Sequence, residues 1–128
     1  MATQQRNLEN LQIGTMLSSA IKTIAATGAE TGINFAGFDG DIVFDLNFSA
    51  AGAGGTLDLR IEESDTLGGT YTAVTGGTFT QIGNAAGSQR LVISKDDAKN
   101  FLRVNVTARG GSASVNMSLD YIGLRKYQ

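Results

Sequence analysis

Two groups of carboxylates are the first candidates for chemistry in this sequence. Asp39-Gly40-Asp41, followed by Asp45, offers hard oxygen ligands, and calcium takes about six to eight such oxygens in irregular loops. Glu62-Glu63-Ser64-Asp65 forms the second group. Paired carboxylates hydrolyse glycosidic bonds when they lie about 5 Å or about 6.5 to 9.5 Å apart across the scissile bond. A calcium site and a glycosidase site are therefore the first two hypotheses.

Both acidic groups also have a simpler structural interpretation. The spacing of Asp39, Asp41 and Asp45 matches no EF-hand loop, and Asp-Gly-Asp is typical of a turn before a strand. Glu62 and Glu63 are sequence neighbours, and neighbours on a strand point to opposite faces, so their carboxylates cannot converge. We therefore predict no metal site, and we expect residues 62–65 to form a solvated strand end.

The residue types that are missing argue against catalysis. The chain contains no His, Cys, Trp or Pro. His and Cys supply most general bases, activated nucleophiles and soft metal ligands. We therefore expect no catalytic residue and no enzyme, although Asp, Glu, Lys, Ser and Tyr leave an unusual active site as the lowest-ranked alternative.

Glycine-rich runs raise a phosphate-binding loop as a further hypothesis. The chain has 17 glycines, and residues 52–55 and 76–77 are two of the places where they gather. Both lack the lysine and the strand-to-helix context that a P-loop needs, whereas paired glycines are typical of turns. We expect turns at both places, no cofactor-binding residue and no cofactor.

Basic and aromatic side chains do not define a binding face. The formal charge is -2, and the basic residues considered for nucleic acid are dispersed: Arg103, Arg109, Arg125 and Lys126. The rings considered for stacking on a sugar are Tyr71, Phe79, Tyr121 and Tyr127. Because only 7% of the residues are aromatic, most rings are needed in the core. We expect no nucleic-acid partner, and a carbohydrate-binding module is the alternative from another class.

Alternation of apolar and polar residues predicts the elements that carry these side chains. Ile42, Phe44, Leu46 and Phe48 point to one face of a strand and polar residues to the other, with Val43 as the exception. The expected strands are residues 21–27, 41–50, 57–62, 71–75, 78–82, 89–94, 101–109 and 113–124. About eight short strands without a long helix predict an all-β, antiparallel β-sandwich, immunoglobulin-like or jelly roll.

The connections and the first twenty residues complete the predicted domain. Residues 51–55 predict a hairpin or a sharp corner, and residues 110–112 predict a hairpin. Residues 1–20 show neither a strand nor a complete helical face, so we assign them to an N-terminal arm, with a short helix at 7–13 as an option. Residues 21–128 form the β-sandwich domain.

Length and composition set the protein class. A chain of 128 residues with 41% hydrophobic residues fits one domain with one core. Without cysteine there is no disulfide framework. The opening residues carry no apolar run of the length that a signal peptide needs, and no stretch approaches the roughly 20 apolar residues of a membrane span. We expect synthesis in the cytoplasm and no membrane partner.

Three stretches carry recognisable strand-and-turn motifs. Residues 57–74 contain Glu63-Ser64-Asp65 and Tyr71-Thr72-Ala73-Val74, and residues 101–107 contain Phe101-Leu102-Arg103-Val104. The third stretch, residues 115–119, follows the hairpin predicted at residues 110–112. In this the sequence resembles small structural proteins of tailed bacteriophages, which share a strand ending in Glu-Ser-Asp, a Gly-rich turn into Tyr-Thr-x-Val and a later Tyr/Phe-Leu/Val-Arg-Val strand. The likeness covers roughly residues 40–124.

The resemblance implies a virion component. Its most plausible form is an auxiliary capsid protein, of the cement or decoration type, that sits on the outer capsid shell and bridges subunits of the major capsid protein. It also implies a homo-oligomer, either trimer or dimer, because such sites lie on symmetry axes. We assign the bridging role to residues 1–20. A tail or head-to-tail component is the alternative within the virion.

Overall fold

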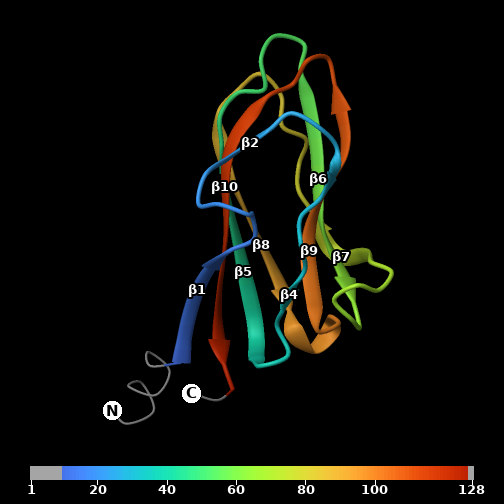
Figure 1. The fold of residues 1–128 in the computed structure, drawn as a ribbon. Helices are drawn as coiled ribbons and strands as arrows, with labels where there is room; N and C mark the ends of the chain where they lie inside the picture. Colours follow the sequence, from blue (N-terminus) through green and yellow to red (C-terminus); the bar gives the residue numbers. More distant parts are fainter. Residues whose placement is uncertain (1–9, 127–128) are drawn as a thin grey trace.

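The computed structural model describes residues 10–126, which form two antiparallel sheets packed face to face (Figure 1). The strands of sheet A are β1 (Leu11–Thr15), β2 (Lys22–Ile24), β5 (Phe38–Phe48), β8 (Gly87–Ser94) and β10 (Val115–Arg125). The strands of sheet B are β3 (Gly28–Ala29), β4 (Ile33–Asn34), β6 (Thr56–Ser64), β7 (Thr72–Thr78) and β9 (Phe101–Gly110). A 3-10 turn, η1 (Lys95–Asp97), joins β8 to β9.

The order of strands confirms the predicted antiparallel β-sandwich. Sheet A has the order β1-β10-β5-β8, with β2 also paired to β10, and sheet B has the order β3-β9-β6-β7, with β4 also paired to β9. The described residues thus contain ten strands rather than about eight: β1, β3 and β4 were not expected, and the strands expected at 71–75 and 78–82 reduce to β7 alone. β3 and β4 have two residues each and are too short to show a period. Within residues 10–126 no helix is long or apolar enough to cross a membrane.

The core lies between the two sheets and follows from the alternation along the long strands. On β5 the side chains of Ile42, Phe44 and Leu46 are fully buried. The facing sheet contributes β6 and β9 residues, which are Leu57, Leu59, Ile61, Leu102 and Val104. Burying each such side chain contributes roughly 1.5–3 kcal/mol. The rings of Phe35, Phe38, Phe44 and Tyr121 cluster at one end, with centroids 4.8 to 6.2 Å apart.

Two glycine-rich corners carry the chain from one sheet to the other. The corner before β6 contains Gly54, with φ +72°, and the corner after β9 contains Gly111, with φ +59°. A Cβ at Gly111 would lie 2.6 Å from the carbonyl oxygen of Gly54, so the two corners touch and need glycine. The first is the predicted sharp corner. The hairpin predicted at 110–112 is wrong, because β9 pairs with β6 while β10 pairs with β5.

The glycine pair at 76–77 lies inside a strand and not between two strands. The sequence predicts strands at 71–75 and 78–82, whereas β7 runs through both glycines. Gly76 has φ +79°, and the pairing of β6 with β7 shifts its register at this level, as in a β-bulge. The strand predicted at 78–82 is reduced to an isolated β-bridge between Leu57 and Ile82.

Much of the predicted N-terminal arm belongs to the sandwich. β1 pairs with β10, and the side chains of Met16 and Leu17, which follow it, are 1% and 6% exposed. The chain from β1 to β4 then crosses from one layer to the other and pairs along an edge of each sheet (Figure 1). The assignment of residues 11–17 to an arm, and of 11–13 to a helix, is therefore wrong. Residues 1–9 lie outside the described residues.

Two substitutions test whether this segment belongs to the core. We expect Met16→Ala to lower the free energy of unfolding by about 2–5 kcal/mol, because it removes buried volume between the sheets. Ile21→Ala, in the loop before β2 where the side chain is 72% exposed, should change it by about 0.5 kcal/mol or less. Urea unfolding measures both. Equal, small effects would place Met16 outside the core.

Candidate interaction surface

The structure separates the aspartates of the calcium hypothesis. Asp41 and Asp45 project from one face of β5, with Val43 between them, so their Cα atoms are about 13 Å apart. Gly40 has φ +72°, which sets an irregularity in the pairing of β5 with β10 and leaves Asp39 exposed. Within residues 10–126 no group of three or more acidic side chains is arranged to hold a metal ion.

Glu62 is buried, contrary to the solvated strand end that the sequence predicts. Its side chain is 2% exposed on the outer face of sheet B. Arg60 donates from Nε at 2.8 Å, Arg103 from Nε at 2.9 Å and Asn105 from Nδ2 at 2.9 Å. Burial raises the pKa of Glu62, but the hydrogen bonds from Asn105, Arg103 and Arg60 outweigh it, so the pKa lies below its usual value. Glu62 is thus an ionised carboxylate whose charge is compensated by two arginines, and its role is structural.

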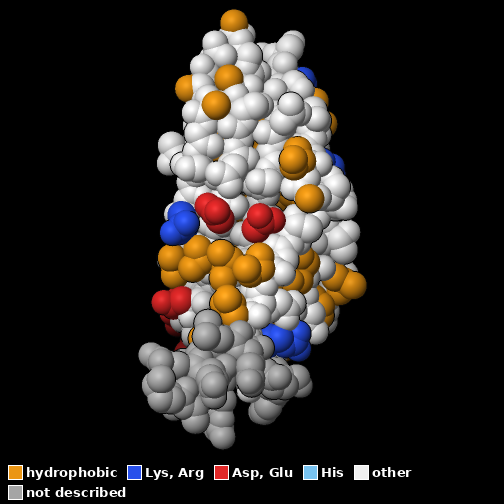
Figure 2. All heavy atoms as spheres, turned by 90° about the vertical axis from the view of Figure 1, so that its left-hand side faces the viewer, with side chains coloured by type: hydrophobic (Ala, Val, Ile, Leu, Met, Phe, Trp, Pro, Cys, Tyr) orange, Lys and Arg blue, Asp and Glu red, His pale blue; other side chains and the backbone are white. Residues whose placement is uncertain are grey.

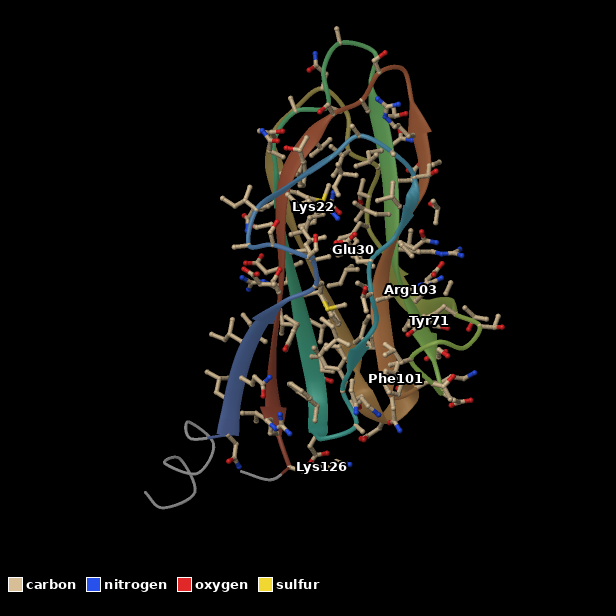
Figure 3. All side chains as sticks on the ribbon, viewed as in Figure 1. Lys22, Glu30, Tyr71, Phe101, Arg103 and Lys126 are labelled. Carbon is tan, nitrogen blue, oxygen red and sulfur yellow. The ribbon has the colours of Figure 1, made fainter. Side chains whose placement is uncertain are left out.

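The motif residues that carry the phage resemblance fold over Glu62. The ring of Tyr71 lies 4.0 Å from the guanidinium carbon of Arg103 (Figure 3), and its hydroxyl donates to the Leu67 carbonyl at 2.8 Å. A Cβ at Gly69 would lie 2.7 Å from the hydroxyl oxygen of Ser64. The motif therefore fixes the β6–β7 loop against β9 by packing and a cation–π contact. This role is structural.

The remaining sequence candidates are dispersed over different parts of the fold. Arg103 is held by Glu62, Arg109 donates to the Ala113 carbonyl, and Arg125 donates to Gln12. Phe79 and Tyr121 are buried, and Tyr71 is stacked on Arg103. Within residues 10–126 these side chains form neither a basic stripe nor an exposed aromatic platform; Tyr127 lies outside that range. The basic side chain of Lys126 is exposed at the end of the described chain.

A cavity of about 250 Å³ lies where β2 and β3 cross the open side of the sandwich. Its wall includes Leu17, Ile24 and Met117. At the rim Lys22 and Glu30 form an ion pair with 2.8 Å between Nζ and Oε2 (Figure 3). Burial raises the pKa of Glu30, but hydrogen bonds from Lys22 and Ser18 lower it by more. The ion pair links β2 to the segment between β3 and β4 and so holds together the two parts of the chain that cover this side of the sandwich.

A row of aliphatic side chains crosses the outer face of sheet A, exposed at its two ends and half-buried in the middle, and no motif predicts it. Ile13, Ile122, Val43 and Val92 are cross-strand neighbours on β1, β10, β5 and β8. Ile13 is 64% exposed and Val92 54% exposed. The row spans the sheet, a distance of about 14 Å. Figure 2 views the molecule from this side, and a band of hydrophobic side chains crosses the face.

Charged side chains border the aliphatic row. On one side Asp120 and Asp45 are direct cross-strand partners, and Arg90 follows on β8. Figure 2 shows two acidic side chains beside the hydrophobic band. On the other side lies Asp41. Like charges directly opposite each other destabilise a sheet, with cross-strand pair energies of roughly 0.2–1 kcal/mol. The face therefore combines exposed aliphatic surface with unfavourable charge pairing.

One signal in the sequence marks this surface. Val43 is the residue that breaks the apolar–polar alternation of β5, and it lies in the middle of the row. Its neighbours in the row come from strands far apart in the sequence, so the row itself appears only when the register of β1, β10, β5 and β8 is known.

Comparison with known proteins identifies a shared fold and no family. No protein-family model matches the sequence, and no curated protein matches it. Among solved structures, VP2 of infectious bursal disease virus, in its subviral particle, is similar over 90% of this chain and 32% of its own, with a TM-score of 0.54 and 15% identity. A structure of the Gt strain of that virus gives 0.53 and 14% identity over 93% of this chain and 35% of its own.

The chain thus spans about a third of the length of those viral proteins, and at these identities the likeness shows the β-sandwich fold alone. A CBM6 carbohydrate-binding module from Zobellia galactanivorans has a TM-score of 0.43 and 11% identity over 89% of this chain and 99% of its own.

The buried carboxylate on sheet B makes a prediction about pH. Glu62→Gln should lower the free energy of unfolding at neutral pH by about 1–3 kcal/mol, because two arginines lose a charged acceptor. The folded pKa lies below the unfolded value of 4.5, so the stabilisation is complete above pH 4.5 and is lost as pH falls through the folded pKa. The difference between the two proteins should therefore shrink below pH 4.5.

Urea unfolding across the acidic range measures this difference. Glu63→Gln is the matched control, because its carboxylate accepts one hydrogen bond, from the Lys99 amide, and the substitution keeps an acceptor oxygen; the change should be about 0.5 kcal/mol or less. Parallel pH profiles for the wild type and Glu62→Gln would contradict the assignment.

Proposed function

We propose that this chain is a virion structural protein of a tailed bacteriophage, an auxiliary capsid protein that binds the outer shell and stabilises it. The observation that carries the proposal is the aliphatic row of Ile13, Ile122, Val43 and Val92 on the outer face of sheet A, in which Ile13 and Val92 are exposed and Ile122 and Val43 are half-buried. A contiguous apolar patch with a polar border is typical of a surface that binds another macromolecule. The proposed partner is the major capsid protein.

The mechanism that this role needs is mechanical. A protein that bridges neighbouring shell subunits adds contacts that exist only in the assembled state, and so stabilises that state by mass action. The sandwich suits the task because its core packs the two sheets together and the Glu62 network joins β6 to β9 within sheet B. We propose no catalytic step.

Two further observations support a virion role. The fold is shared with VP2, a protein that forms subviral and T=1 particles. The motifs of residues 57–74 and 101–107 resemble those of phage structural proteins, and they form one packed unit around Arg103. In such a role a dimer or trimer would place copies on a symmetry axis of the shell.

The structure changes how the bridging hypothesis for residues 1–20 is tested. Deleting all twenty residues removes β1 together with Met16 and Leu17, so it would destabilise the sandwich itself. Loss of capsid binding after that deletion would therefore not identify an arm. Point substitutions on the exposed face avoid this ambiguity.

Co-sedimentation with empty shells tests the proposed function. The purified protein should bind shells of the phage that encodes it, saturate at a fixed ratio to the major capsid protein, and raise the temperature at which the shells break. Shells disrupted into free subunits are the control and should bind less. Absence of saturable binding would contradict the proposal, and saturable binding to a glycan array in its place would favour a carbohydrate-binding module.

A further inference from the structure

We infer that the outer face of sheet A is the docking surface of this protein, and that its partner is a protein surface of aliphatic side chains flanked by lysine or arginine. The inference rests on the proposed function and adds to it the face that docks and the chemistry of the surface it meets. Two observations carry it: the places where aliphatic side chains are exposed to solvent, and the places where carboxylates have no partner among the side chains of residues 10–126.

The aliphatic side chains gather on one of the two outer faces. Ile13, Ile122, Val43 and Val92 form the row, and Leu11 and Leu124, which are cross-strand partners, continue it on β1 and β10. Leu11 is 44% and Leu124 36% exposed. On sheet B the outward positions of β6 and β9 carry Arg60, Glu62, Arg103 and Asn105 instead. Burying the sheet A row is favourable only against an apolar surface.

The carboxylates on the two outer faces differ in whether they have a partner side chain. On sheet B Glu62 binds two arginines, and Asp58 accepts a hydrogen bond from Gln81. On sheet A the side chains of Asp41, Asp45 and Asp120 make no hydrogen bond or ion pair with any other side chain of residues 10–126. These three carboxylates flank the row on β5 and β10, and Arg90 on β8 is the cross-strand neighbour of Asp45. The charge that would complement them is positive.

A second copy of this chain that covers the whole row fits the face poorly. A two-fold axis parallel to the strands lays the row on itself and brings Asp45 opposite Asp120 of the other copy. A two-fold axis along the row brings Asp45 opposite Asp41 of the other copy. Both arrangements oppose carboxylates in a closing interface, which costs binding free energy. Charge complementarity therefore favours a different, basic partner.

Shell binding by variants of the aliphatic row tests the docking surface. Ile13→Ser with Val92→Ser should weaken binding by about tenfold or more, because two exposed anchors lose their apolar contacts. Leu67→Ser, in the β6–β7 loop where the side chain is 51% exposed, is the matched control and should stay within about twofold of wild type.

The charge pair is tested with Asp45→Asn and Asp120→Asn together. Relief of repulsion between facing carboxylates should raise the melting temperature while shell binding weakens, by roughly threefold or more, and loses most of its dependence on salt between about 0.05 and 0.5 M. Asp65→Asn, on the sheet B side, is the control. A gain in stability with a loss of binding distinguishes a docking role from misfolding.

The outcomes separate this inference from the proposed function. No shell binding by the wild type would overturn both. If the wild type binds shells and the double variant Ile13→Ser with Val92→Ser binds them equally well, the docking face alone is overturned. If deletion of residues 1–9 then abolished shell binding, attachment would depend on that segment. Conversion of an oligomer to a monomer by the same double variant would identify a second copy as the occupant and overturn the basic partner.

Discussion

The packing of the inner faces of the two sheets against each other is the interaction on which the rest of the structure depends. Every second residue of each long strand points into that layer. The other residues point outward, so packing of the core does not constrain which residue types they are. The glycine corners at Gly54 and Gly111 let the chain change sheets twice at one end. The segment from β1 to β4 pairs along an edge of both sheets and completes the enclosure.

The two outer faces then meet the solvent in different ways. Sheet B binds its buried carboxylate, Glu62, with Arg60, Arg103 and Asn105, and the loop after β6 packs over that network. Sheet A leaves an aliphatic row and three carboxylates that form no ion pair with another side chain of residues 10–126. A face whose polar groups are satisfied internally contributes rigidity. A face that keeps apolar surface and unpaired charge gives up stability and gains the ability to bind, and this asymmetry is the basis of the structural role proposed above.

The sequence predicts those parts of the fold that have a period. β5, β6, β9 and β10 are long enough to show alternation, and their inward residues follow from it. β3 and β4 have two residues each and no period, and β1 mixes outward Ile13 with the buried Met16 that follows it. Two glycines signal a change of direction, but they do not say whether the chain returns to the same sheet, as the corner at Gly111 shows. Likewise, outward position on a strand did not predict the burial of Glu62, because two of its three partners, Arg103 and Asn105, come from β9.

The aliphatic row combines residues from positions 13 to 122, so it depends on register, and Val43 alone marks it in the sequence. The most direct test of the account is a cryo-electron microscopy reconstruction of shells with this protein bound. We predict that the outer face of sheet A lies against the major capsid protein, with basic side chains of that protein beside Asp45 and Asp120. A reconstruction in which this face is open to solvent while another surface contacts the shell would contradict the account.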